Sequence, residues 1–130
     1  VKGFVFHKQE KAFGKLYGGE ASAIYGDSFK RDGNIVGGIG NNVVIVYENM
    51  DFGQPGADRV MICGWTPLPA NTIHIHFTEE TGETVNRIVE FRGDGGKEQT
   101  FRIQRLQGKG KIELVFLPGS NFDLEAIQFT

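Results

Sequence analysis

The 130-residue sequence has little of what several protein classes need. Its single cysteine, Cys63, cannot form a disulfide within the chain and leaves the redox compartment open. It has no apolar run long enough to span a membrane. Its net charge is only −2, with both signs mixed, whereas phosphate binding depends on a basic surface. We therefore expect neither a membrane nor a nucleic acid as partner.

The sequence also lacks an initiator methionine and a signal peptide. It opens at Val1 without the charged region and apolar core of a secretory leader. We therefore expect a piece of a longer polypeptide. Residues 1–12 are predicted to form a linker or an edge strand left from an upstream domain. Residues 13–130 suit one domain with a single core.

No segment shows a helical period over ten or more residues, so we expect little helix. Nineteen glycines and only four prolines favour many tight turns between short strands. Nine apolar segments recur between such turns, which predicts an all-β, jelly-roll β-sandwich of about nine short strands. The predicted strands are residues 13–17, 35–39, 43–47, 59–63, 72–77, 85–91, 101–106, 112–117 and 124–129. The predicted core comprises Val43, Ile45, Ile62, Ile73, Ile75, Phe77, Phe91, Ile112, Leu114 and Phe116.

Three features that resemble reactive sites have simpler explanations. Cys63 lies within a predicted strand, where a small buried thiol is favoured over a nucleophile. His74 and His76 share the outer face of their strand, but no third zinc ligand is fixed by spacing. The glycine-rich run 37–40 lacks the lysine and the following helix of a phosphate-binding loop, so a turn at a strand entry is expected.

The C-terminal quarter carries the most specific pattern. Its apolar residues alternate along residues 112–116, and the turn 118–120 follows. Asn121 and Asp123 then fall on the same side of an extended segment, where an amide and a carboxylate suit a sugar hydroxyl or a hard cation. The alternative role for Asn121 is an Asx turn that stabilises the loop.

Sugars are recognised by aromatic rings that stack on their C–H faces, together with planar hydrogen-bonding groups. Trp65 is the only tryptophan and precedes the proline-containing segment 66–69. It either forms an exposed stacking platform or packs beneath the prolines as a structural plug, and the plug is slightly favoured. Tyr25 and Tyr47 are further candidate platforms.

Taken in order along the chain, these segments resemble the carbohydrate-binding modules of family 6 and their galactose-binding-like relatives. The resemblance covers about residues 13–129 and rests on residues 18–27, 36–43, 59–64, 95–101 and 112–129. More narrowly, residues 24–29, 39–43, 49–52 and 116–123 resemble the C-terminal accessory domain of bacterial family 2 glycoside hydrolases of β-galactosidase type. The resemblance implies that Asn121 is the amide used for sugar binding at the rim of the sandwich.

The resemblance also implies a structural calcium ion near Glu20 and Asp123, with Asp27 supplying further charge. The family often carries a second acidic residue two positions after the first, where this sequence has Ser22. The alternative is that Glu20 and Asp123 accept backbone N–H groups and cap loops. The family's aromatic clamp is absent, because its positions fall at Gly38 and at residues 97–98, which are Lys and Glu.

The expected function is that of a noncatalytic module that binds galactose-type or plant glycans weakly and holds a glycosidase domain of the same polypeptide near its substrate. No pair of carboxylates lies in a recognisable catalytic segment, so the domain alone is not expected to be an enzyme. A secreted or cell-associated bacterial glycosidase is favoured as the parent, and a cytoplasmic location stays open. The alternative is a purely structural domain that packs on its catalytic neighbour without a ligand.

Overall fold

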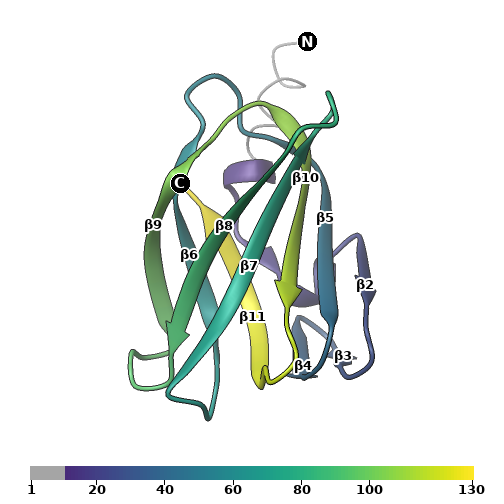
Figure 1. The fold of residues 1–130 in the computed structure, drawn as a ribbon, viewed down its shortest axis with the longest axis vertical. Helices are drawn as coiled ribbons and strands as arrows, with labels where there is room; N and C mark the ends of the chain where they lie inside the picture. The colour runs from purple at the N-terminus through teal and green to yellow at the C-terminus, as the bar shows by residue number, and fades with distance from the viewer. Residues whose placement is uncertain (1–10) are drawn as a thin grey trace.

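The computed structural model describes residues 11–130 (Figure 1). The expected linker or edge strand at residues 1–12 therefore lies almost wholly outside the described residues, and residues 11–13 are helical. Besides these residues, the described chain contains one helical element, the 3-10 turn η1 (Gly18–Glu20). No helix in residues 11–130 has the length and apolar character needed to cross a membrane.

Eleven strands in residues 11–130 form two antiparallel sheets. In the first sheet the strand order is β3-β4-β11-β6-β9, and β1 also pairs with β11. Its strands are β1 (Leu16–Tyr17), β3 (Lys30–Asp32), β4 (Ile35–Ile39), β6 (Ala57–Trp65), β9 (Glu98–Leu106) and β11 (Phe122–Phe129). In the second sheet the order is β2-β5-β10-β7-β8. Its strands are β2 (Ala23–Tyr25), β5 (Val43–Asp51), β7 (Ala70–Glu79), β8 (Thr84–Arg92) and β10 (Lys109–Phe116).

The predicted all-β sandwich is confirmed, and each of the nine predicted strands overlaps an observed one. The additional strands are β2 and β3, each only three residues long. Such short segments show no alternation of their own, and their strand conformation depends on pairing with β5 and β4. The observed strands also extend beyond most of the predicted bounds.

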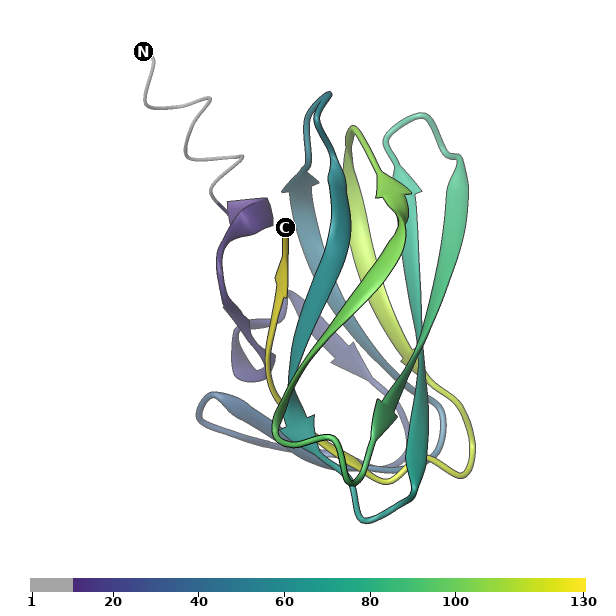
Figure 2. The same ribbon diagram turned by 90° about the vertical axis from the view of Figure 1, so that its left-hand side faces the viewer.

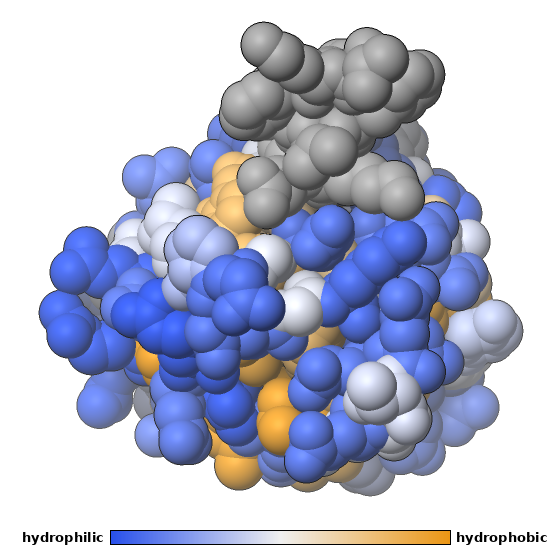
Figure 3. All heavy atoms as spheres, turned by 90° about the horizontal axis from the view of Figure 1, so that it is seen from above, coloured by the Kyte–Doolittle hydropathy of each residue, from blue (hydrophilic) through white to orange (hydrophobic). Residues whose placement is uncertain are grey.

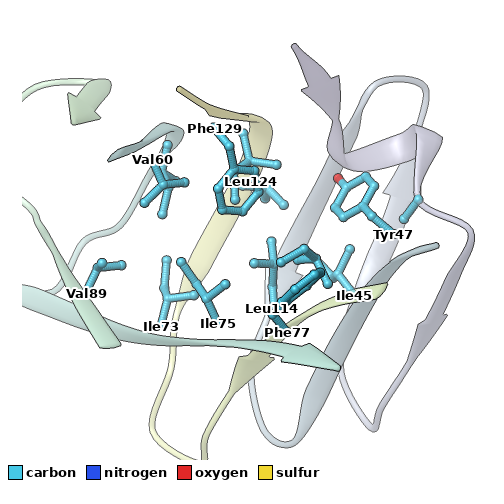
Figure 4. Close-up of a cluster of buried hydrophobic side chains, with 14 of the residues drawn as sticks. Ile45, Tyr47, Val60, Ile73, Ile75, Phe77, Val89, Leu114, Leu124 and Phe129 are labelled. Atoms are coloured by element: carbon cyan, nitrogen blue, oxygen red, sulfur yellow. The ribbon is translucent and has the colours of Figure 1, made fainter. Parts of the chain in front are cut away.

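The core fills the space between the two sheets, and side chains from both inner faces meet there (Figure 4). All ten predicted core residues are buried. Phe52 packs edge-on against Phe77 and Phe129, with ring centroids 5.3 Å and 5.2 Å apart. Tyr47 corrects the sequence interpretation: it is 2% exposed, so it belongs to the core and offers no stacking platform.

The sandwich has two ends with different loops. One end, at the bottom of Figure 1, carries the segments 66–69, 93–97 and 117–121, which we call the rim. These segments follow β6, β8 and β10 and lead into β7, β9 and β11. The opposite end carries the connections 52–56 and 80–83, and hydrophilic side chains cover most of it in Figure 3.

Candidate functional site

Trp65 is the most exposed large aromatic side chain near the rim. The side chains of β6 alternate between the core and the outer face of the first sheet, and Trp65 follows the inward Gly64. Its Cα pairs with that of Asp123 on β11. Trp65 is 57% exposed, so the favoured interpretation of a plug beneath the prolines is wrong. The indole is instead available as a stacking surface.

A hollow of about 520 Å³ opens beside Trp65 between two rim segments. Its walls come from residues 65–69 on one side and from Arg92, Gly93 and Asp94 on the other. Arg92 and Asp94 are both exposed. The guanidinium offers planar donors and the carboxylate offers acceptors, so the hollow combines an aromatic face with charged hydrogen-bonding groups. This volume falls in the range of small-molecule sites.

Hydrogen bonds within the rim hold this hollow in shape. The Gln99 side chain accepts the Arg92 N–H at 2.9 Å and donates to the carbonyls of Arg92 and Gly96 at 2.7 Å and 2.8 Å. The Gly93 N–H donates to the Pro69 carbonyl at 3.0 Å and joins the two walls. Arg92 and Asp94 thus lie on a turn that the hydrogen bonds of the Gln99 side chain constrain.

Asn121 lies in the rim, where its backbone contacts Thr66, the residue that follows Trp65. Its N–H donates to Asn71 Oδ1 at 2.8 Å, and its carbonyl accepts the Thr66 hydroxyl at 2.6 Å. The two bonding partners, Asn71 and Thr66, are buried, and each is 3% exposed. The Asn121 residue itself is exposed. The backbone is fixed while the amide faces solvent, an arrangement that suits ligand binding.

Tyr25, the third predicted sugar-binding residue, lies on the other sheet. Its Cα pairs with that of Val44, in a row that continues through Val115 and His74 to Ile88. Cross-strand partners share a face, so this row lies on the outer face of the second sheet. Tyr25 is 63% exposed, but the structure does not bring it together with Trp65 and Asn121.

The positions of the missing aromatic clamp are occupied by groups with other partners. The Gly38 N–H donates to Asp123 Oδ1 at 2.9 Å. Lys97 Nζ lies 2.7 Å from Glu125 Oε1. Both positions flank the strands that carry Asp123 and Trp65 in the order β4-β11-β6-β9. Trp65 is therefore the aromatic residue that this part of the sheet provides.

Cys63 lies beneath the Lys97–Glu125 ion pair and is 6% exposed, as predicted for a buried thiol. Burial raises the pKa of the Cys63 thiol, and the negative charge of Glu125 raises it further. Hydrogen bonding to Lys97 lowers the pKa of Glu125, and the same bond raises the pKa of Lys97. This environment disfavours the thiolate and the nucleophilic chemistry that needs it.

The three carboxylates predicted to bind calcium do not form one group. Glu20 Oε1 accepts the Tyr17 N–H at 3.1 Å, and Asp123 Oδ1 accepts the Gly38 N–H. Asp27 is exposed in the segment between β2 and β3. Within residues 11–130, no three His, Cys, Asp or Glu side chains are grouped as metal ligands. These residues do not fit a calcium site, and the bonds of Glu20 and Asp123 are those of the alternative, loop capping.

Sequence reasoning missed Arg92, Asp94 and Gln99. The glycine-rich segment 93–96 marks a turn, but only the pairing of β6 with β9 and the hydrogen bond from Gly93 to Pro69 bring that turn to Trp65. The signal that the sequence contains is a glycine-rich turn flanked by polar residues.

No family model and no curated protein matches this sequence. Solved structures do match its fold. A family 6 carbohydrate-binding module of Clostridium stercorarium in complex with cellobiose has a TM-score of 0.69 at 24% identity, over 92% of this chain and 94% of that one. A family 36 module in complex with calcium and xylotriose has a TM-score of 0.66 at 17% identity, over 90% of this chain and 99% of that one.

A third similar structure is a family 43 arabinoxylan arabinofuranohydrolase of Bacillus subtilis in complex with cellotetraose. Its TM-score is 0.62 at 24% identity, over 74% of this chain and 21% of that chain. The likeness thus covers only a small part of that enzyme. Together these structures show that the chain has the fold of family 6 carbohydrate-binding modules. The narrower resemblance to a domain of family 2 glycoside hydrolases stays a prediction.

Proposed function

We propose that this domain is a noncatalytic carbohydrate-binding module that takes glycan at the rim, in the hollow beside Trp65. The observation that carries the proposal is the exposed indole of Trp65 next to Arg92 and Asp94. An indole face suits the C–H face of a sugar ring, and the charged groups suit its hydroxyls. Asn121 adds an exposed amide close by.

Binding rather than hydrolysis is supported by the composition of the hollow. Glycoside hydrolysis uses two carboxylates that face each other across the sugar, about 5 to 10 Å apart. Asp94 is the only carboxylate among the described residues that line the hollow. One carboxylate orients a hydroxyl but does not supply both the acid and the base or nucleophile of that mechanism.

In this proposal the domain serves a glycoside hydrolase on the same polypeptide, of family 2 β-galactosidase type. Its ligands are galactose-type or plant glycans, bound weakly enough that the enzyme moves along its substrate. The module then raises the effective concentration of substrate at the catalytic domain. The sequence resemblance supports the enzyme type, and the similar segment of the arabinofuranohydrolase supports the association with a glycosidase. Structural calcium is not part of this proposal.

Calorimetric titration of galactosides, cello-oligosaccharides and xylo-oligosaccharides tests the site with two matched variants. Trp65→Ala should weaken binding about tenfold or more, equivalent to ~1.4 kcal/mol. Tyr25→Ala removes a similarly exposed aromatic from the other sheet and should leave the affinity unchanged. Equal affinities of wild type and Trp65→Ala would contradict the rim site. The absence of binding to every glycan would favour the structural alternative.

That alternative, a domain that packs on its catalytic neighbour, is favoured by one observation. The row Tyr25, Val44, Val115, His74 and Ile88 crosses all five strands of the second sheet on its outer face. Tyr25 and Ile88 are 63% and 57% exposed. Ile88→Glu should weaken the association between this domain and a separately expressed catalytic domain, measured by analytical ultracentrifugation.

A further inference from the structure

Arg31 binds the backbone around the segment where the resemblance implies a calcium ion. Its Nε donates to the Gly19 carbonyl at 3.0 Å, and its terminal nitrogen donates to the carbonyls of both Gly19 and Ala21, the latter at 3.1 Å. These carbonyls flank Glu20. One guanidinium therefore gathers two backbone oxygens on either side of an acidic residue.

These oxygens are of the kind that a hard cation prefers. Calcium is bound by carboxylates and backbone carbonyls from separate segments. A guanidinium also seeks carbonyl and carboxylate oxygens, but it presents fixed donors in a plane. A further side-chain oxygen of this segment, Ser22 Oγ, accepts the Glu48 N–H at 3.0 Å. In the described structure, the Gly19 and Ala21 carbonyls, Glu20 Oε1 and Ser22 Oγ are thus each bonded to a protein donor.

The charges of Arg31 and Glu20 both act on the buried hydroxyl of Tyr47. Burial raises the pKa of the Tyr47 hydroxyl; the negative charge of Glu20 raises it further, and the positive charge of Arg31 lowers it. The Tyr47 hydroxyl donates to the Tyr17 carbonyl at 2.9 Å, immediately before η1. The positive charge of Arg31 therefore partly offsets the effect of the Glu20 carboxylate on the Tyr47 hydroxyl.

Arg31 comes from a hairpin that projects from the side of the sandwich. The strands β3 and β4 form this hairpin next to the segment that contains η1 (Figure 2). The Gly19 N–H donates to the Asn34 carbonyl at 3.0 Å and adds a second link between the two. The hairpin thus places the Arg31 guanidinium beside η1 and holds it in that position.

We propose that the Arg31 guanidinium takes the place of a structural calcium ion in this domain, so that the fold is independent of divalent cations. The family 36 module with a similar fold was solved in complex with calcium. This chain supplies a positive charge of its own from β3, and Glu20 and Asp123 bond to backbone N–H groups. The proposal is independent of glycan binding.

Thermal unfolding of the whole chain in calcium and in chelator tests this proposal. The wild type should have the same melting temperature in both. Arg31→Ala should melt several degrees lower in chelator, and millimolar calcium should recover part of that loss, because the vacated carbonyls and Glu20 become a cation site. Lys30→Ala is the matched control, because it removes an exposed cation from the same strand. It should leave the melting temperature unchanged both in chelator and in calcium.

Three results would overturn the proposal. The first is a calcium-dependent melting temperature of the wild type. The second is an Arg31→Ala protein as stable as Lys30→Ala. The third is an Arg31→Ala protein that is destabilised but indifferent to calcium, which would make Arg31 an ordinary cross-link. If Arg31→Ala does not fold, Arg31→Gln replaces it, because the amide keeps a donor and removes the charge.

Discussion

At the scale of single residues, Tyr47 links the N-terminal segment to the core. Its hydroxyl donates to the Tyr17 carbonyl, and its pKa is raised chiefly by burial. The folded state therefore retains this proton at a pH where the unfolded chain has lost it. The stability that follows is fully present below the ordinary tyrosine pKa of about 10 and is lost as the pH rises toward the folded value.

We therefore expect the free energy of unfolding to fall as the pH rises above about 10, and Tyr47→Phe to reduce that slope. Denaturant unfolding at a series of alkaline pH values measures it. Tyr25→Phe is the control, because Tyr25 is exposed and its hydroxyl does not sit in the core. An identical slope in wild type and Tyr47→Phe would show that other groups govern the alkaline loss.

Asn71 holds the backbone of Asn121 in the candidate site. Its Oδ1 accepts the Asn121 N–H, and its Nδ2 donates to the Thr72 carbonyl at 3.3 Å. Asn71→Ala should lower the free energy of unfolding by about 1–3 kcal/mol, because the partly buried Asn121 N–H loses its acceptor. It should also weaken glycan binding by loosening Asn121.

Asn86→Ala is the control for this variant, because Asn86 is exposed on β8. Chemical denaturation and calorimetric titration measure the two effects separately. A stable Asn71→Ala protein with unchanged affinity would show that the loop holds Asn121 without this bond.

At the scale of elements, the two walls of the hollow meet at a position that only glycine fits. A Cβ at Gly93 would lie 2.1 Å from the Leu68 carbonyl oxygen. Gly93→Ala should therefore push the segments 66–69 and 93–97 apart, lower stability by about 1–3 kcal/mol and weaken glycan binding. Gly37→Ala is the control, since its Cβ would meet only the Asp123 side chain, at 3.2 Å. Equal stability of the two variants would contradict this tight contact.

The long strands were predictable because apolar and polar residues alternate along them in the sequence. Along β7, Ile73, Ile75 and Phe77 are buried, and His74 and His76 between them are only partly so. The strand β3 was not predictable, because its residues Lys30–Asp32 are all exposed and carry no apolar period. Its conformation comes from pairing with β4.

The candidate site was only partly predictable for a related reason. Asn121 and Trp65 were named from the sequence, but the exposure of Trp65 depends on the register of β6 against β11. Arg92 and Asp94 join them through contacts between segments far apart in the chain. Long-range pairing of this kind leaves no local period to detect.

At the scale of the whole molecule, the last strand is an interior strand. The strand β11 lies between β4 and β6 and also pairs with β1 near the other end of the described chain. The first sheet is therefore completed only when the C-terminal residues are in place. Sheets with such distant pairings fold slowly, because loop closure precedes the stabilising contacts.

The exposed aromatic of the rim and the exposed Ile88 lie on different sheets. Trp65 lies on the outer face of the first sheet at the rim, and Ile88 lies on the outer face of the second. No residue of the row that contains Ile88 lines the hollow beside Trp65, but Arg92 of that hollow also lines a second hollow with Ile88. A glycan that stays in the hollow beside Trp65 should leave that row accessible to a neighbouring domain.

We expect Ile88→Glu to leave the glycan dissociation constant unchanged, and the double variant Trp65→Ala/Ile88→Glu to match Trp65→Ala alone. The effects of the two substitutions on the free energy of unfolding should add to within about 0.5 kcal/mol, because Trp65 and Ile88 lie on different sheets and do not line a common hollow. Calorimetric titration and denaturant unfolding of the four proteins measure both quantities. A change of affinity in Ile88→Glu would mean that glycan extends over the second sheet, and the row would then belong to the binding site rather than to a domain contact.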